Sequence, residues 1–152
     1  MLKVECLGNR ELLKLKKTAF LASSIISSET VLRCYDWATE MRNQGECVVS
    51  GFSSKLEQDV LHFLLKGSQP IILVLARRMY RELPDELKEP LAQNRLLIIS
   101  VSNAIRQSKA TAMARNRYVC EMADCMCFVG VTEQSSLYAY KNEFLNKLSK
   151  SI

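Results

Sequence analysis

Residues 70–76 read PIILVLA, an unbroken apolar run with the length of a β-strand. A strand with one face in water alternates apolar and polar residues, whereas a continuous run is typical of a strand buried on both faces of a parallel sheet. Neighbouring parallel strands are joined by crossovers that are usually helical. The run therefore predicts an α/β fold in which strands and helices alternate along the chain.

The sequence on both sides of this run shows that alternation. Short apolar or β-branched segments predict further strands at 18–23, 46–50, 96–101 and 125–131. Helical spacing of apolar residues predicts helices at 29–43, 55–66, 83–94, 112–123 and 135–148. Ser28 is the expected N-cap of the first of these helices, and Gly45 follows its end. The pattern predicts a Rossmann-like three-layer α/β fold with a mainly parallel sheet of about five strands.

The length of 152 residues indicates one domain. We expect residues 1–17 to form a short helical extension capped by Asn9, and residues 18–152 to form a single Rossmann-like domain. The longest apolar run falls far short of the ~20 residues that a membrane helix needs, and the charged N-terminus lacks the apolar core of a secretory signal. The sequence therefore predicts a cytoplasmic protein that binds no membrane.

The six cysteines and the single histidine lack the spacing of a metal site. No two cysteines form a CxxC pair, and His62 is expected on the polar side of its helix, so buried free thiols in a reducing cytosol are favoured over zinc. The chain also has no GxGxxG dinucleotide loop, Walker A loop, GxSxG elbow or HExxH motif. We predict no metal, no cofactor and no catalytic residue.

The distribution of charge is more informative than the net charge of +5. Residues 90–120 contain no Asp or Glu, yet they contain Arg95, Arg106, Lys109, Arg115 and Arg117. A segment with charges of one sign favours an anionic partner such as a phosphate or a nucleic acid. A solvated basic face is an equally good interpretation of charge alone.

Polar residues follow the predicted strands where a ligand is expected to bind. In open α/β sheets, ligands lie beyond the carboxyl ends of the strands. The serine-rich stretches 23–24, 50–54 and 132–136 and the pair Arg77 and Arg78 occupy these positions. Free N–H groups at helix starts, together with hydroxyls, form anion sites. Each serine taken alone could be an N-cap, but several such loops on one edge favour a ligand that carries phosphate.

The stretch ARNRYVCEMAD at 114–124 places an arginine on the inner face of a helix. If Val119 faces inward, Arg115 and Asn116 lie on the same face, while Arg117 lies roughly opposite. A lone buried charge is very costly, so an inward Arg115 needs a carboxylate, carbonyl groups or a bound anion. A salt bridge to Glu57 or Asp124 and a contact with a ligand both remain open.

Four segments in order resemble the Rossmann-like domain of the DNA-processing protein A (DprA/Smf) family: FLASS at 20–24, VVSGF at 48–52, ARNRYVCEMAD at 114–124 and VGVTEQSSL at 129–137. The resemblance covers roughly residues 18–140 and extends to the wider superfamily of LOG-type nucleotide-binding proteins. It implies binding of single-stranded DNA, a role in DNA processing or recombination, assembly into a dimer and a RecA-type recombinase as partner. It also implies that Arg115, Asn116 and Arg117 line a pocket with residues 50–53.

The chain also departs from that family. Residues 54–57 read SKLE where the family has RGID, and Ser135 and Ser136 stand where a glycine is usual. The PGGxGT loop of LOG hydrolases is absent, which argues against that activity. The predicted nucleotide or DNA site comprises Ser23, Ser24, Ser50, Gly51, Phe52, Ser53, Lys55, Arg77, Arg78, Arg115, Asn116, Arg117, Ser135 and Ser136.

Three functions are compatible with this site. We favour a DprA-like protein that binds single-stranded DNA or nucleotides and is not an enzyme. The alternative is a sensor domain for a small molecule derived from a nucleotide. A LOG-like nucleotide hydrolase that uses Glu57 or Glu133 as acid or base is the least favoured. Phe52, Tyr80 and Tyr118 are the candidates for stacking on bases.

Overall fold

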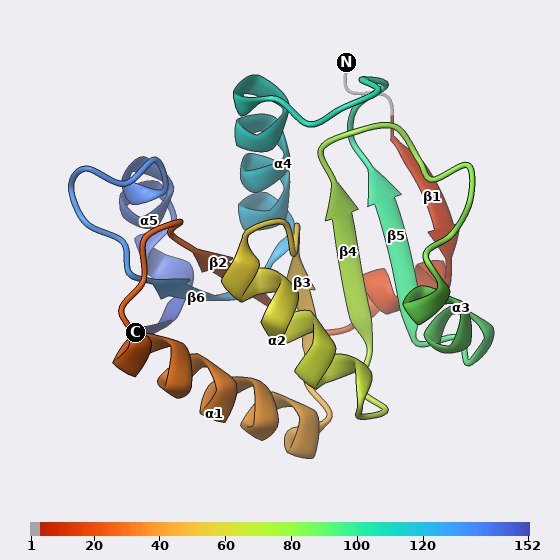
Figure 1. Cartoon of the computed structure of the whole chain (residues 1–152), viewed down its shortest axis with the longest axis horizontal. Helices are drawn as coiled ribbons and strands as arrows, with labels where there is room; N and C mark the ends of the chain where they lie inside the picture. Colours follow the sequence, from red (N-terminus) through yellow and green to blue (C-terminus); the bar gives the residue numbers. More distant parts are fainter. Residues whose placement is uncertain (1–3) are drawn as a thin grey trace.

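The computed structural model describes residues 4–152. Its centre is a seven-stranded sheet with the order β1-β5-β4-β3-β2-β6-β7 (Figure 1). The outer strand β1 runs antiparallel to β5, and every other neighbouring pair is parallel. The strands are β1 Glu5–Gly8, β2 Lys17–Ala22, β3 Cys47–Ser50, β4 Ile71–Leu75, β5 Leu96–Ser100, β6 Cys125–Val129 and β7 Leu148–Ser151.

Helices cover both faces of the sheet and complete three layers (Figure 1). Buried side chains of α1, α2 and α3 pack on one face, and those of α4 and α5 pack on the other. The apolar run at 70–76, which predicted the fold, contacts both helical layers. Leu73 of β4 packs on the side of α1, α2 and α3, and Val74 packs on the side of α4 and α5. The α-helices are α1 Ser28–Gln44, α2 Lys55–Leu65, α3 Asp85–Ala92, α4 Lys109–Met122 and α5 Tyr138–Glu143, and the 3-10 helices are η1 Arg10–Lys14 and η2 Leu145–Lys147.

The α/β class and the mainly parallel sheet are confirmed, but the sheet has seven strands instead of about five. The two additional strands are its edges, β1 and β7, each of four residues that are mostly exposed. Because a short edge strand buries little, its side chains carry no apolar pattern, and only backbone pairing defines it. The predicted short helix is present as η1, and Asn9 caps it by accepting from the N–H of Glu11. The division of the chain at residue 17 stays a prediction.

The predicted closing helix at 135–148 is too long. Only Tyr138–Glu143 is α-helical, and Leu148, expected to be its last inward residue, begins β7 beside β6. The inward positions Leu137 and Tyr140 are buried as expected. Beyond them the backbone pairs with the sheet, and the N–H of Ile152 donates to the carbonyl of Phe128. The carbonyl of Ile152 then accepts from the N–H of Gly130, at 2.9 Å.

Smaller corrections concern the helix starts. Helix α1 begins at Ser28 with Ser27, not Ser28, as its N-cap, while Gly45 ends it in the left-handed conformation with φ 69°. Helix α4 begins at Lys109, three residues earlier than expected, because Ser108 and Thr111 form a capping box. No helix in residues 4–152 is long and apolar enough to cross a membrane.

The six cysteines are free thiols in this fold. Burial raises the pKa of Cys34 to about 11 and the pKa values of Cys47, Cys120 and Cys127 to about 12. Such thiols stay protonated and unreactive. Trp37 is a core residue stacked on Phe20, with ring centroids 4.9 Å apart, and His62 is exposed, as expected.

Candidate functional site

Arg115 lies in the second turn of α4 and is only 3% exposed. Its Nε donates to Oδ1 of Asn116 at 2.8 Å, and its Nη2 donates to the hydroxyl of Ser53 at 3.1 Å. Its Nη1 makes two long contacts of 3.5 Å, with the carbonyl of Val74 and the side-chain oxygen of Gln107. All four partners are neutral, so the predicted inward arginine is confirmed and its charge is not neutralised by them.

The two carboxylates that could have paired with Arg115 are engaged elsewhere. Within residues 4–152, no carboxylate oxygen lies within 4.0 Å of its guanidinium. Asp124 accepts from the N–H of Lys17 at 2.8 Å. Burial lowers the pKa of Arg115, and the charge of nearby Glu57 partly offsets this effect. Arginine nevertheless keeps its proton in proteins, so the site holds a buried cation without an ion-pair partner.

Glu57 has a structural task. Its Oε2 accepts from the N–H of Ala22 at 3.0 Å, and its Oε1 accepts from the N–H groups of Ser53 at 3.0 Å and Ser54 at 3.3 Å. The hydroxyl of Ser54 accepts from the N–H of Glu57 in return, which completes a capping box at the start of α2. The carboxylate therefore joins the end of β2 to the start of α2.

Gly51 makes room for the guanidinium. A Cβ atom at this position would overlap Nη1 and Cζ of Arg115, so only glycine lets the side chain cross the loop after β3. The next residue, Phe52, adopts the left-handed φ of 46° although it is bulky. Its N–H donates to the hydroxyl of Ser50 at 3.1 Å, which holds the turn. The segment VVSGF at 48–52 and the segment ARNRY at 114–118 are therefore in direct contact through Gly51 and Arg115.

A pocket of about 570 Å³, here called the rim pocket, opens beside Arg115 at the carboxyl edge of the sheet. Seven of the predicted site residues line it: Ser23, Ser24, Ser53, Arg115, Asn116, Ser135 and Ser136. Ser53 and Ser135 are occupied by bonds within the protein, because Ser135 accepts from the N–H of Thr132 at 2.9 Å. The hydroxyls of Ser23, Ser24 and Ser136 have no partner within the described part of the chain.

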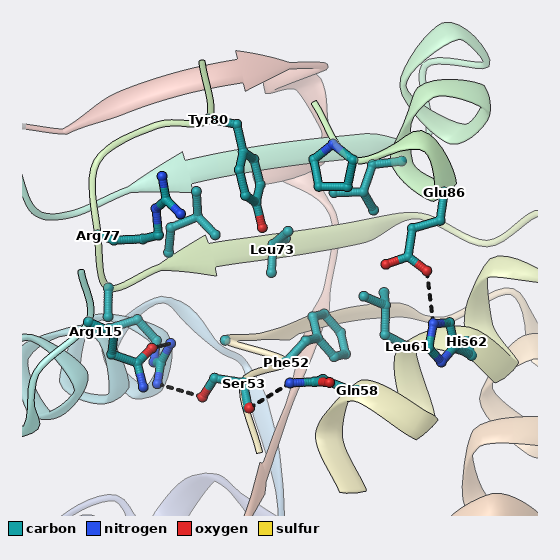
Figure 2. Close-up of a pocket in the computed structure, with 16 residues that line it drawn as sticks. Phe52, Ser53, Gln58, Leu61, His62, Leu73, Arg77, Tyr80, Glu86 and Arg115 are labelled. Atoms are coloured by element: carbon teal, nitrogen blue, oxygen red, sulfur yellow. Dashed lines mark hydrogen bonds and ion pairs between the residues drawn. The ribbon is translucent and has the colours of Figure 1, made fainter. Parts of the chain in front are cut away.

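A second cavity of about 350 Å³, here called the side pocket, lies on the other side of Arg115 (Figure 2). Gly51, Phe52 and Arg77 are predicted site residues in its wall, and Tyr80 is a predicted stacking residue there. Ser53, Gln107 and Arg115 line both pockets. The buried guanidinium of Arg115 therefore forms part of the wall of both cavities.

Other predicted site residues lie outside these two pockets. Arg117 points to the opposite side and binds Glu143 with two bonds of 2.7 and 2.8 Å, which raise its own pKa and lower that of Glu143. Lys55 pairs with Asp59 at 2.6 Å and lines a small third cavity with Ser23 and Ser24. Ser50 is fully buried. The backbone N–H of Arg78 donates to the carbonyl of Ala104. Tyr118 packs against the core beneath α4.

The acid-free stretch at 90–120 is divided between two ends of the molecule. Arg95 lies at the start of β5, where its guanidinium donates to the carbonyls of Leu65 and Gln69. Arg106, in the connection from β5 to α4, and Lys109, the first residue of α4, are exposed at the edge where Arg115 lies. The basic edge thus comprises Arg77, Arg78, Arg81, Arg106, Lys109 and Arg115.

Sequence reasoning missed several lining residues. Gln107, which both pockets share, is a single polar residue in a loop, and no pattern distinguishes it there. Ile25 is 88% exposed and lines the rim pocket, but the short apolar pair Ile25 and Ile26 between serines gives no signal of a site either. Thr132 and Gln134 lie in a loop that was expected at this edge, but they were not included in the site.

A mainly parallel α/β sheet, with a buried cation and free hydroxyls at its carboxyl edge, defines the class: a Rossmann-like α/β protein. The family model for DNA recombination-mediator protein A matches residues 3–139. The chain belongs to this family.

Solved structures agree with this fold. DNA processing protein A from Helicobacter pylori, described with its single-stranded DNA binding mode, is 21% identical, with a TM-score of 0.76. The protein of the same name from Streptococcus pneumoniae is 18% identical, with a TM-score of 0.75. The alignment with the Helicobacter pylori protein covers 96% of this chain and 70% of that chain. The alignment with the Streptococcus pneumoniae protein covers 95% of this chain and 52% of that chain.

More distant proteins share only the architecture. The molybdenum cofactor carrier protein from Chlamydomonas reinhardtii is 8% identical, with a TM-score of 0.51, and the alignment covers 91% of this chain and 90% of that one. No curated protein matches the chain in sequence at a significant level.

Proposed function

We propose that the chain binds single-stranded DNA through its phosphates at the rim pocket, in DNA processing or recombination. The observation that carries this proposal is Arg115, buried with neutral partners and with no carboxylate in contact. A buried charge of this kind is stabilised by a bound anion. The free hydroxyls of Ser23, Ser24 and Ser136 can donate to the same phosphate oxygens. Membership in the family and the ligand of the Helicobacter pylori protein make single-stranded DNA the favoured anion.

The alternative ligand is a free nucleotide, because a cavity of about 570 Å³ also has the size of a small-molecule site. The two ligands differ in their dependence on chain length. A strand is supported by the exposed Arg81 and Arg106, which adjoin the lining residues Tyr80 and Gln107 in the sequence, because further phosphates would contact them. A hydrolase is less well supported, because the oxygens of Glu57 are already engaged by backbone N–H groups.

The test is the affinity for oligothymidylates of increasing length and for thymidine monophosphate, each at two salt concentrations. We expect affinity to rise with length and log K to fall with log salt by about 0.7 for each phosphate neutralised. Arg115→Gln should weaken binding by at least tenfold and make this slope shallower. Arg33→Gln, on the exposed side of α1, removes the same charge as a control and should leave both quantities unchanged.

Normal binding by a folded Arg115→Gln protein would refute the rim pocket as the DNA site. Affinity that is independent of length would instead favour the nucleotide sensor. Thermal melting checks that each variant is folded. Loss of this arginine should not lower stability, because removing an unpaired buried charge removes its desolvation cost.

We also propose the remaining properties that the family resemblance implies: residence in the cytoplasm, a homodimer and contact with a RecA-type recombinase. The dimer has some support in the exposed apolar side chains of Leu7, in the outer strand β1, and of Val4, just before this strand. Light scattering over a range of concentrations measures the oligomeric state, and pull-down with purified recombinase tests the partner.

A further inference from the structure

We propose that the edge strand β7, together with Ile152 directly after it, positions one wall of the rim pocket. Pairing of this strand with the sheet and binding of a ligand in the pocket would then strengthen each other. The inference rests on the proposed function and adds a control of the site by residues that do not line it. Neither Leu148–Ser151 nor Ile152 belongs to the wall of the rim pocket.

The first argument is the pair of hydrogen bonds that Ile152 makes. Its N–H donates to the carbonyl of Phe128 in β6 at 2.9 Å, and its carbonyl accepts from the N–H of Gly130, also at 2.9 Å. Gly130 directly follows β6 and lines the rim pocket. One residue at the end of β7 is therefore bonded both to a central strand and to the pocket wall.

The second argument is the position of Gly130. It has the left-handed φ of 62°, and a Cβ atom there would collide with Cδ1 of Ile26. The same loop after β2 is held to β6 by the N–H of Ser23, which donates to the carbonyl of Val129 at 2.9 Å. This loop supplies Ser23 and Ser24 to the rim pocket. Gly130 therefore connects β7 with two walls of the pocket.

The third argument is the loop that begins at Gly130. Two bonds of 2.9 Å close its middle into a turn: the N–H of Ser135 donates to the carbonyl of Thr132, and the N–H of Thr132 donates to the hydroxyl of Ser135. A closed turn moves as a unit when its start moves. Thr132, Ser135 and the free hydroxyl of Ser136 all line the rim pocket, so their placement depends on where Gly130 is held.

The fourth argument is the small number of contacts that hold β7. Only Leu148 of its four residues is half-buried, and the others are exposed. In the described part of the chain the strand pairs with β6 alone, and the register is irregular at Met126 and Cys127. Segments with few buried contacts open at a low cost in free energy. A ligand that prefers the ordered wall must then favour the paired strand, and the paired strand must favour the ligand by the same factor.

The experiment breaks the pairing without touching the pocket. Ile152→Pro removes the N–H that donates to Phe128 and keeps every charge. We expect the affinity for an oligothymidylate to fall by about fivefold or more, since couplings between sites are typically about 5–150-fold. The slope of log K against log salt should stay the same, because no phosphate contact is lost.

Ser151→Pro is the matched control. Alternate residues of a strand direct their N–H groups to opposite sides, so the N–H of Ser151 faces away from β6 when that of Ile152 faces it. Proline is tolerated in an edge strand at such a position. The affinity of Ser151→Pro should therefore equal that of the wild-type protein, and thermal melting checks that both variants are folded.

Hydrogen exchange in the wild-type protein tests the reverse direction. A saturating oligothymidylate should slow exchange of the Ile152 N–H by about fivefold or more, although this residue does not line the pocket. The amides of β1, at the opposite edge of the sheet, should exchange at an unchanged rate. A strand that only stabilises the fold would show no response to the ligand.

The outcomes separate this inference from the proposed function. If the wild-type protein binds no oligothymidylate, the proposed function fails and this inference fails with it. If folded Ile152→Pro binds as tightly as the wild-type protein, the phosphate site stands and the coupling is refuted. If Ile152→Pro does not fold, the exchange experiment decides: slower exchange at Ile152 supports the coupling, and unchanged exchange refutes it.

Discussion

At the scale of single residues, the site depends on the relation between Arg115 and Gly51. The guanidinium crosses the loop after β3 at a place where any Cβ atom would collide with it. Its hydrogen bonds to Asn116 and Ser53 then fix its direction toward the rim pocket. A charge held this way is already oriented before a ligand arrives, so binding costs little side-chain entropy.

The variant Gly51→Ala tests this relation. The added methyl group should displace the guanidinium and weaken binding of oligothymidylate by at least tenfold, while Arg115 itself is still present. Isothermal titration measures the affinity. Gly45→Ala is the control, since Gly45 has nothing within 4 Å of its would-be Cβ and lies at the end of α1; its cost should fall on stability alone. Unchanged affinity in Gly51→Ala would mean that Arg115 need not cross this loop.

At the scale of elements, the carboxylate of Glu57 holds together two loops of the rim pocket. It accepts three backbone N–H groups, one from the end of β2 and two from the start of α2. Bonds from N–H groups to an ionised carboxylate are among the stronger hydrogen bonds in proteins. The serines of both loops therefore keep their spacing through a residue that does not have to touch the ligand.

Glu57→Ala should lower the free energy of unfolding by about 2 kcal/mol, because it leaves the buried N–H of Ala22 without an acceptor. Urea denaturation measures this change. Glu133→Ala, in the exposed loop after β6, is the control and should change stability by less than about 0.5 kcal/mol. Wild-type stability in Glu57→Ala would contradict the inference that the carboxylate of Glu57 holds the end of β2 and the start of α2 together.

The elements also show how far sequence reasoning reached. The ends of the central strands β2 to β6 were predicted within one or two residues. A strand that is buried on both faces needs apolar residues along its whole length, so it is recognisable as a continuous apolar run. The edge strands β1 and β7 were missed because their side chains are mostly exposed and backbone pairing alone defines them. The predicted helix at 135–148 was too long, because the spacing of apolar residues does not indicate that the chain leaves the helix and pairs with β6.

The candidate site divides in the same way. Helical spacing placed Arg115 correctly, since an inward position follows from Val119 on the same face. The fate of its charge depended on contacts from distant loops, so the sequence left a salt bridge open. Gln107 had no periodicity to reveal it, and the side pocket arises only where α2, α3 and the loop after β4 meet.

At the scale of the whole molecule, the sheet separates two apolar layers, and thiols lie in both. Cys34 and Cys127 belong to one layer, and Cys47 and Cys120 belong to the other. Desolvation is the main cause of the raised pKa of each. Thiol chemistry therefore reports on the integrity of both layers at once.

We expect only Cys6 and Cys125, which are half-buried, to react readily with a thiol reagent in the folded protein, and all six cysteines to react in denaturant. Because folding raises the pKa of the four buried thiols from 9.0, the unfolded chain loses their protons first. Their contribution to stability is therefore complete below pH 9 and declines between about pH 9 and 12. Melting temperatures at pH 8 and pH 10 measure the decline, and rapid native reaction of more than two thiols would contradict the burial.

The pairing of the last strand has a practical consequence. Ile152 is bound through its carbonyl to Gly130, and Gly130 lines the rim pocket. An affinity tag or a fluorescent protein joined after Ile152 would emerge beside the pocket mouth, where it could obstruct a strand or hold its own charges near the ligand.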